Sequence, residues 1–195
     1  MKLGKLLLAV VGATVLLGAL VATASAGRFE ISSQSGRGTW VTMNFGGGFG
    51  TVECEVVLEW TFHTRSITKT AGSLIGYVTA GNVSRCARGN ATVNRGSLPW
   101  HVRYTSFTGT LPNITGLSAT VTGAEWTTRE PTFGITCTVR AAESSTIGTF
   151  TLSSGIVTRL EASGESRCGE FSGRLSGSTT NVENRSGARL TIRLI

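Results

Sequence analysis

The chain has 195 residues, of which 18 are Lys or Arg and 11 are acidic, and its formal net charge is +7. Every acidic residue is Glu, so an EF-hand loop, an Asp-containing catalytic triad and a Walker-B site are all excluded. Charged residues make up 15% of the chain and hydrophobic residues 40%, which excludes a disordered chain and a charge-rich coiled coil. Thr, Val, Ile and Gly are frequent and helix formers are scarce, which favours an all-β protein.

The first 26 residues have the pattern of a secretory signal peptide. Two lysines precede the uncharged run 6–22, and small residues follow at 24–26, which predicts cleavage after Ala26. Removal of this segment leaves 16 basic and 11 acidic residues, a net charge of +5. We therefore expect 27–195 to form a single all-β domain that is secreted, extracellular or cell-wall-associated, with no stable membrane insertion after cleavage.

The clearest strand signal runs from Val52 to Phe62, where apolar and polar side chains alternate almost without exception. A period of two over this length predicts a long half-buried strand. Similar alternation occurs at Leu117–Val121, Ile135–Val139 and Leu190–Leu194, and the glycine-rich run Gly46–Gly50 predicts a turn. The pattern favours a sandwich or barrel of about ten to twelve short antiparallel strands.

A weak internal repeat runs through this pattern. Val52–Val56 matches Ile135–Val139, and about thirty residues after each of them Ser84–Cys86 matches Ser166–Cys168. The matching segments occur in the same order in both halves. We interpret them as two pseudo-repeated halves that share one core, with convergent strand composition as the alternative.

Four cysteines in an exported chain predict disulfide bonds. Three pairings are possible, and the repeat favours Cys54–Cys86 and Cys137–Cys168, one in each half (about 27–110 and 111–195). A loop of this length contributes about 3.5–4 kcal/mol in the chain-entropy model. The chain has no Cys-x-x-Cys pair, so we expect no metal site, and nothing in the sequence calls for a cofactor.

Two groups of residues are candidates for catalysis. His63 and His101 are the only histidines, but the Gly-x-Ser-x-Gly motif of a nucleophile elbow is absent. Glu53 and Glu55 lie on one face of the predicted strand, with Cα atoms about 6.7 Å apart, and paired carboxylates can serve glycoside hydrolysis. Solvent-exposed side chains on a strand explain both groups more simply. A small secreted hydrolase that uses His101 or the Glu53/Glu55 pair is therefore an alternative to a binding role.

The densest mixture of basic and aromatic residues is the candidate binding surface. Guanidinium groups beside exposed aromatic rings can hold an anionic polymer such as a wall polyanion, an acidic glycan or nucleic acid. A solvated basic surface is the alternative. The residues are Arg85, Arg88, Arg95, Trp100, His101, Arg103 and Tyr104.

A third interpretation is a β-barrel that encloses an apolar ligand. An interior void would then be lined by residues such as Leu58, Val121 and Leu152. An internal cavity and a filled core have the same sequence pattern, so the sequence leaves this alternative open.

Two segments, Leu74–Thr79 and Leu98–Gly116, resemble an uncharacterised family of exported, signal-peptide-bearing bacterial all-β proteins. The resemblance implies export, paired cysteines and a β fold, and it assigns no site residues. Taken together, the sequence favours a secreted, disulfide-stabilised β-domain with a non-catalytic binding or structural role at the cell exterior.

Overall fold

The computed structural model describes residues 27–47, 50–110, 113–130, 134–141, 147–168 and 171–195. Within these residues the chain forms fifteen strands and the short 3₁₀ helix η1 (Arg95–Ser97). In chain order the strands are β1 (Arg28–Ile31), β2 (Ser35–Gly47), β3 (Gly50–Phe62), β4 (Ser66–Thr68), β5 (Leu74–Ala87), β6 (Asn90–Val93), β7 (Trp100–Thr110), β8 (Asn113–Thr122), β9 (Glu125–Arg129), β10 (Thr136–Ala141), β11 (Ile147–Ser153), β12 (Ile156–Cys168), β13 (Phe171–Ser178), β14 (Asn181–Glu183) and β15 (Ile192–Leu194).

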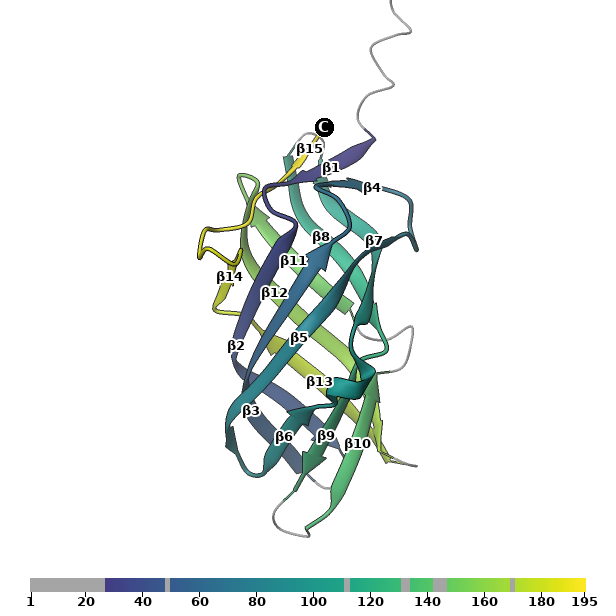
Figure 1. The fold of residues 1–195 in the computed structure, drawn as a ribbon, viewed down its shortest axis with the longest axis vertical. Helices are drawn as coiled ribbons and strands as arrows, with labels where there is room; N and C mark the ends of the chain where they lie inside the picture. The colour runs from purple at the N-terminus through teal and green to yellow at the C-terminus, as the bar shows by residue number, and fades with distance from the viewer. Residues whose placement is uncertain (1–26, 48–49, 111–112, 131–133, 142–146, 169–170) are drawn as a thin grey trace, which may run out of the picture.

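Eight strands pair edge to edge into a closed antiparallel ring (Figure 1). The ring runs β2–β3–β5–β7–β8–β11–β12–β13, and β13 pairs with β2 to close it. Spatial order follows chain order, so the wall is an up-and-down barrel, and its ring has no free sheet edge. The predicted all-β fold is confirmed.

Three strands of the wall, β7, β8 and β11, extend over only part of its height, and each is followed or preceded in the chain by a separate strand. Below the breaks, β6, β9 and β10 continue the wall at the lower end of Figure 1, where β6 pairs with β9, β9 with β10 and β10 with β12. Pro99 has no N–H for a ladder at the first break, and Gly123 at the second has a φ of +86°, a conformation suited to glycine. These breaks, and the short strands outside the ring, explain why the structure has more strands than the ten to twelve expected.

The barrel wall separates apolar from polar residues. On β3, the predicted alternation is present: Glu53, Glu55 and Glu59 are half-buried while their apolar neighbours face the interior. The interior residues of this strand that are 0–5% exposed are Val52, Cys54, Val56, Trp60 and Phe62. The register of β2 on β3 shifts between Trp40 and Met43, and this bulge brings both of these side chains into the core while Val41 between them is 57% exposed.

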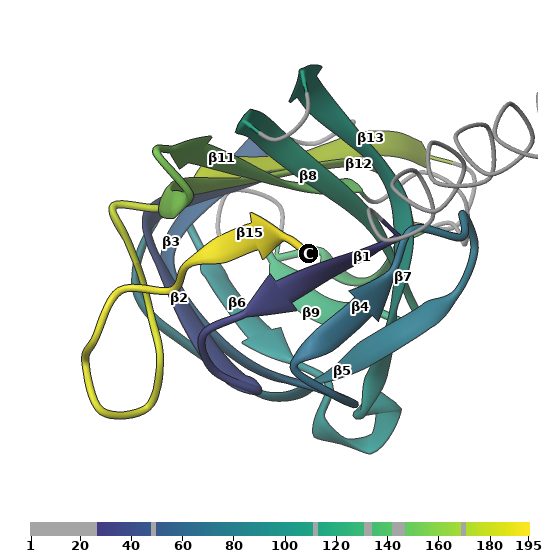
Figure 2. The ribbon, with the colours of Figure 1, turned by 90° about the horizontal axis from the view of Figure 1, so that it is seen from above.

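A small sheet crosses the upper mouth of the barrel (Figure 2). Its strands pair in the order β15–β1–β4, and the Phe29 ring lies 5.9 Å from the Tyr104 ring and 5.6 Å from the Phe107 ring. Burial raises the pKa of Tyr104 above its ordinary value of 10.0. The cap residues that are 0–3% exposed are Phe29, Ile31, Ile67 and Ile192.

The disulfide predicted between Cys54 and Cys86 is confirmed, and it joins the neighbouring strands β3 and β5. Cys137 is also disulfide-bonded. The side chain of Cys168 lies outside the described residues, so the predicted Cys137–Cys168 pair stays a prediction. The pairing of β10 with β12 places these two cysteines on neighbouring strands.

The Cys54–Cys86 disulfide closes a chain segment of 32 residues. Replacing Cys54 by Ala and Cys86 by Ser together should lower the free energy of unfolding by about 3–4 kcal/mol, because the unfolded chain gains the entropy that the crosslink removes. Urea unfolding under non-reducing conditions measures this. The variant Ser84→Ala on the same strand should stay within about 0.5 kcal/mol of the wild type. An unchanged midpoint in the double variant would contradict the prediction.

Candidate functional site: the barrel cavity

The barrel encloses an apolar cavity of about 80 Å³. No charged side chain is among its lining residues. The aromatic ones are Trp40, Trp60, Phe62, Trp100, Trp126 and Phe150. The others are Met43, Leu58, Val78, Val102, Ala119, Val121, Ala124, Ile147, Gly148, Leu160, Ala162 and Leu175.

All four tryptophans of the chain lie on the lining, although they come from different strands. The Trp126 ring lies 5.1 Å from the Trp100 ring and 5.1 Å from the Phe45 ring, and Trp60 meets Phe150 edge to face at 5.9 Å. Tilted and edge-to-face arrangements at these distances are favourable for aromatic pairs. The rings therefore support each other and form a rigid side of the cavity.

Glycines make room for the indole rings on the inner wall. A Cβ atom at Gly36 would lie 2.3 Å from Cε2 and Nε1 of Trp60, and one at Gly177 would lie 3.0 Å from Cδ1 of Trp40. A Cβ atom at Gly38 would lie within 3.2 Å of both the Trp40 ring and the Trp60 ring. Any larger residue at Gly36 would displace an indole ring, so the glycines determine where the aromatic side of the cavity lies.

On the side of the cavity opposite these rings, no bulky side chain fills the space, because three neighbouring strands carry small residues at the same level. Gly148 on β11 pairs with Ala119 on β8 and with Ala162 on β12. All three line the cavity. This small-residue row faces bulky aromatic side chains without filling the space between them.

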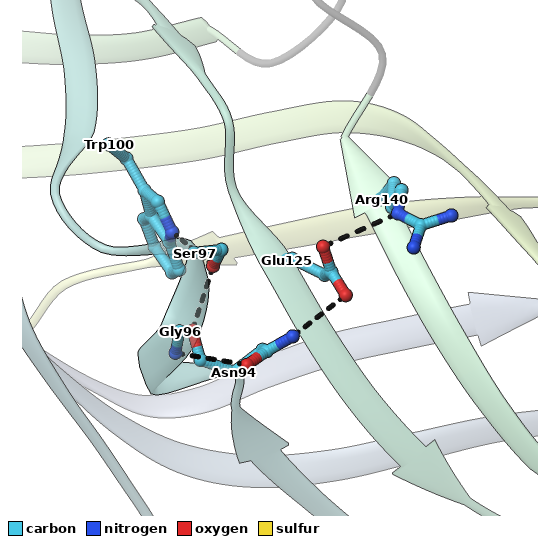
Figure 3. A network of polar contacts seen from close by, with 6 residues as sticks. All are labelled: Asn94, Gly96, Ser97, Trp100, Glu125 and Arg140. Carbon is cyan, nitrogen blue, oxygen red and sulfur yellow. Dashed lines mark hydrogen bonds and ion pairs between the residues drawn. The ribbon is translucent and has the colours of Figure 1, made fainter.

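A polar network on the barrel wall joins the interrupted strands (Figure 3). The Asn94 side chain donates to Oε1 of Glu125 at 2.8 Å, and Nε of Arg140 donates to Oε2 of the same carboxylate at 3.3 Å. The network also reaches the cavity, because Ser97 Oγ donates to the Asn94 carbonyl oxygen and accepts the indole N–H of Trp100 at 2.9 Å. It therefore fixes one indole ring of the lining.

The environment of Glu125 stabilises its charged form. The hydrogen bond from Asn94 is the largest influence that lowers its pKa below the ordinary value of 4.5, partial desolvation opposes it, and Arg140 adds a hydrogen bond and an attractive charge. The carboxylate is therefore a fixed negative charge at neutral pH, held where the three interrupted strands meet.

The predicted basic and aromatic surface is divided between the two sides of the wall. Along β7 the side chains alternate, so His101 and Arg103 are exposed whereas Trp100 and Tyr104 are only 1% and 3% exposed. These two rings therefore do not belong to a surface shared with the arginines, which corrects that part of the hypothesis. The exposed arginines of the group are Arg85, Arg88, Arg95 and Arg103.

Arg85 forms an ion pair of 3.3 Å with Glu55, one of the two carboxylates considered for catalysis. The two histidines lie on the outer surface, where each packs edge-on against Tyr77, His63 at 4.9 Å and His101 at 5.2 Å between ring centres. None of these residues lines the barrel cavity. A second, more polar pocket at the lower end of the barrel does not contain them either; it is lined by Gly89, Asn90, Arg129 and Gly134.

Of the residues expected to line an internal void, Leu58 and Val121 do so, and Leu152 is buried without reaching the cavity. Sequence reasoning missed Trp40, Trp60 and Trp126 as lining residues. The inward orientation of these three side chains depends on strand register. The signal available in the sequence was the position of each tryptophan in a segment where apolar and polar residues alternate.

No family model, curated protein or solved structure matches the chain. The part of the chain that the structure describes contains no helix long and apolar enough to cross a membrane. Among the same residues, no three His, Cys or Glu side chains are grouped so that they could hold a metal ion.

The packing of Trp60 on Gly36 predicts that Gly36→Ala lowers the free energy of unfolding by about 1–3 kcal/mol, because the new methyl group overlaps the indole ring. The near-ultraviolet circular dichroism of the tryptophans should change as well. Gly47 lies on the same strand with no atom within 4 Å of an added Cβ, so Gly47→Ala is the matched control and should change little. Equal stability of the two variants would show that the indole does not rest on Gly36.

The lowered pKa of Glu125 makes stability depend on pH. A carboxylate of this kind stabilises the fold above the pKa of the unfolded chain, and the contribution disappears as the pH falls through the lower folded value. Glu125→Gln should therefore be less stable at pH 7, and its stability should decline less steeply below pH 5. Urea unfolding between pH 7 and pH 3 measures both effects.

The matched control for this titration is Glu161→Gln. Glu161 is 47% exposed and forms an ion pair with Arg159 on the same strand. Its replacement should leave the slope of stability with pH close to that of the wild type. A Glu125→Gln profile that is parallel to the wild type would contradict the assigned role of the network.

Proposed function

We propose that the chain is an exported, non-catalytic binding protein whose barrel holds a small apolar ligand, or the apolar end of a larger one. The observation that supports this most directly is the partly open cavity in the barrel, lined by apolar side chains and glycine and by no charged group. Eight-stranded barrels have interiors that are either just filled by side chains or able to hold one small ligand. The signal peptide pattern, the Cys54–Cys86 disulfide and the resemblance to exported proteins support a role outside the cell.

The volume of the cavity limits the ligand. It is about 80 Å³, roughly half of an engineered 150 Å³ cavity that binds benzene. A group of about four to five non-hydrogen atoms suits this space, and a larger one requires the lining side chains to move. Very small ligands gain at most about 1.5 kcal/mol per non-hydrogen atom, which is about 6–7.5 kcal/mol for such a group, so its dissociation constant should be no lower than about 3 μM.

Ile147 marks the place where the cavity approaches the surface. It is among the residues that line the cavity and is also 39% exposed. It stands at the start of β11, beside the small-residue row of Ala119, Gly148 and Ala162. At the capped upper end, the described side chains Phe29, Ile31, Ile67 and Ile192 are at most 3% exposed. We assign the entrance to the wall at Ile147.

The other two functions gain less support. The arginines of the predicted binding surface are exposed, but the buried rings of Trp100 and Tyr104 contribute no aromatic contacts to that surface. Binding of an anionic polymer by these arginines stays a prediction. The hydrolase alternative lacks a concave site around His101 or the Glu53/Glu55 pair in the two cavities described.

The proposal is tested by titrating the protein with isobutene, cyclopentane and p-xylene, a series of increasing size, while the tryptophan fluorescence is recorded. Isobutene and cyclopentane should bind with dissociation constants no lower than about 3 μM and raise the thermal midpoint, since a ligand that binds only the folded state stabilises it. p-Xylene should bind more weakly, because it exceeds the volume of the cavity.

Matched variants locate the binding site. Ala119→Leu fills the cavity and should weaken binding at least about tenfold, whereas Ala80→Leu adds the same side chain to an exposed position on β5 and should have no effect. Ala162 is half-buried and belongs to the same small-residue row, so Ala162→Leu also fills the cavity. It replaces Ala119→Leu in this test if that variant does not fold. Absence of binding by all three hydrocarbons, or equal binding by both leucine variants, would refute the proposed function.

A further inference from the structure

The polar pocket at the lower end of the barrel is separate from the apolar cavity (Figure 1). It has a volume of about 250 Å³ and is lined by Gly89, Asn90, Arg129 and Gly134, none of which lines the barrel cavity. A cavity of about 150 Å³ holds benzene. The lower pocket therefore has room for a six-membered ring that carries several substituents.

The pairing of β6 with β9 brings the two polar side chains of this pocket together. Asn90 stands directly opposite Arg129, so both side chains lie on the same face of the sheet. Both are exposed, whereas Thr128, the next residue on β9, is 8% exposed and faces the interior. Gly89 and Gly134 have φ values of +135° and +65°, which suit glycine and leave the sides of the pocket without side chains. The pocket is thus on the outer surface.

Arg129 differs from other arginines of the wall in what stands opposite it. Three of those arginines each stand opposite a glutamate on the neighbouring strand: Arg193 opposite Glu30, Arg140 opposite Glu125 and Arg174 opposite Glu165.

The neighbours of Arg129 across the sheet are both neutral. They are Asn90 on β6 and Thr136 on β10. In the described part of the chain, no ion pair or hydrogen bond involves the Arg129 guanidinium. The pocket therefore has a positive charge that no carboxylate of these residues neutralises.

The two side chains suit different parts of one ligand. A guanidinium group is always charged, and its planar fork can donate two parallel hydrogen bonds to a carboxylate. The side-chain amide of Asn90 can both donate and accept, as the hydroxyl groups of a sugar require. Because the pocket is on the surface, a bound carboxylate keeps part of its water and loses little solvation. A ring with one carboxylate and neighbouring hydroxyl groups matches these features better than a neutral sugar does.

We propose that this pocket binds an acidic sugar, a hexuronate unit that is free or part of an acidic glycan. The carboxylate of the sugar pairs with Arg129, and its hydroxyl groups bond to Asn90. This inference goes beyond the proposed function, because the site lies outside the barrel and does not involve the apolar cavity. Arg129 is also not among the arginines of the predicted binding surface.

Glucuronate and glucose test the proposal, because they share a six-membered ring and differ in a carboxylate or a hydroxymethyl group. Proton–nitrogen NMR spectra of the protein are recorded during a titration with each sugar. Glucuronate should shift the backbone amide signals of Gly89, Asn90 and Gly134 until they saturate. Glucose should bind at least about tenfold more weakly, because it makes no hydrogen bond between two charged groups.

Matched variants locate the site. Arg129→Gln should weaken glucuronate binding at least about tenfold, and Asn90→Ala, which keeps the charge, about threefold. Arg159→Gln is the control, because it changes the net charge equally at a residue that is paired with Glu161. It should leave the affinity within about twofold of the wild type. Asn90→Ala and the comparison of the two sugars on the wild type remain decisive if Arg129→Gln does not fold.

Three results would overturn the proposal: no binding of glucuronate, equal binding of glucuronate and glucose, or equal glucuronate binding by Arg129→Gln and Arg159→Gln. None of them bears on the barrel cavity, since Arg129 does not line it. Isobutene should accordingly bind to Arg129→Gln as it binds to the wild type. Each of the two proposals can therefore fail without the other.

Discussion

Closure of the eight-stranded ring is the constraint on which the rest of the structure depends. The ring is closed by pairing of β13 with β2, which brings Gly177 opposite Met43 although they are far apart in the sequence. Closure fixes the diameter of the interior, and eight strands leave a space that side chains nearly fill. Trp40 and Trp60 fit into this space because Gly36, Gly38 and Gly177 leave room on the wall. The position of the indole rings thus follows from the register of a long-range pairing.

The interruptions in the wall would weaken such a ring if they were not bridged. Strand pairing continues below each break through β6, β9 and β10, and the carboxylate of Glu125 binds both Asn94 and Arg140 across them. Because Ser97 links this network to the indole of Trp100, the bridge that repairs the wall also orients a ring of the cavity. The barrel wall and the cavity lining therefore depend on the same network of hydrogen bonds.

Local sequence pattern was sufficient for part of this fold and insufficient for the site. The alternation in Val52–Phe62 predicted β3 and its two faces, since a period of two needs no tertiary information. The disulfide between Cys54 and Cys86 followed from the internal repeat. The bulge after Trp40 was not predictable from local pattern, whereas the alternation of apolar and polar residues in Trp100–Tyr104 already indicates that the two rings and the basic residues lie on opposite faces.

The cavity itself is a consequence of register between distant segments. Ala119, Gly148 and Ala162 are separated by about thirty and fourteen residues in the sequence, yet each is paired with the next across β8, β11 and β12. A slip of one residue would turn the small side chains outward and bring Thr120 or Ser118 to the inner face, since successive residues point to opposite sides of a strand. The same pairing that holds these strands together therefore keeps the space opposite the indole rings unfilled and apolar.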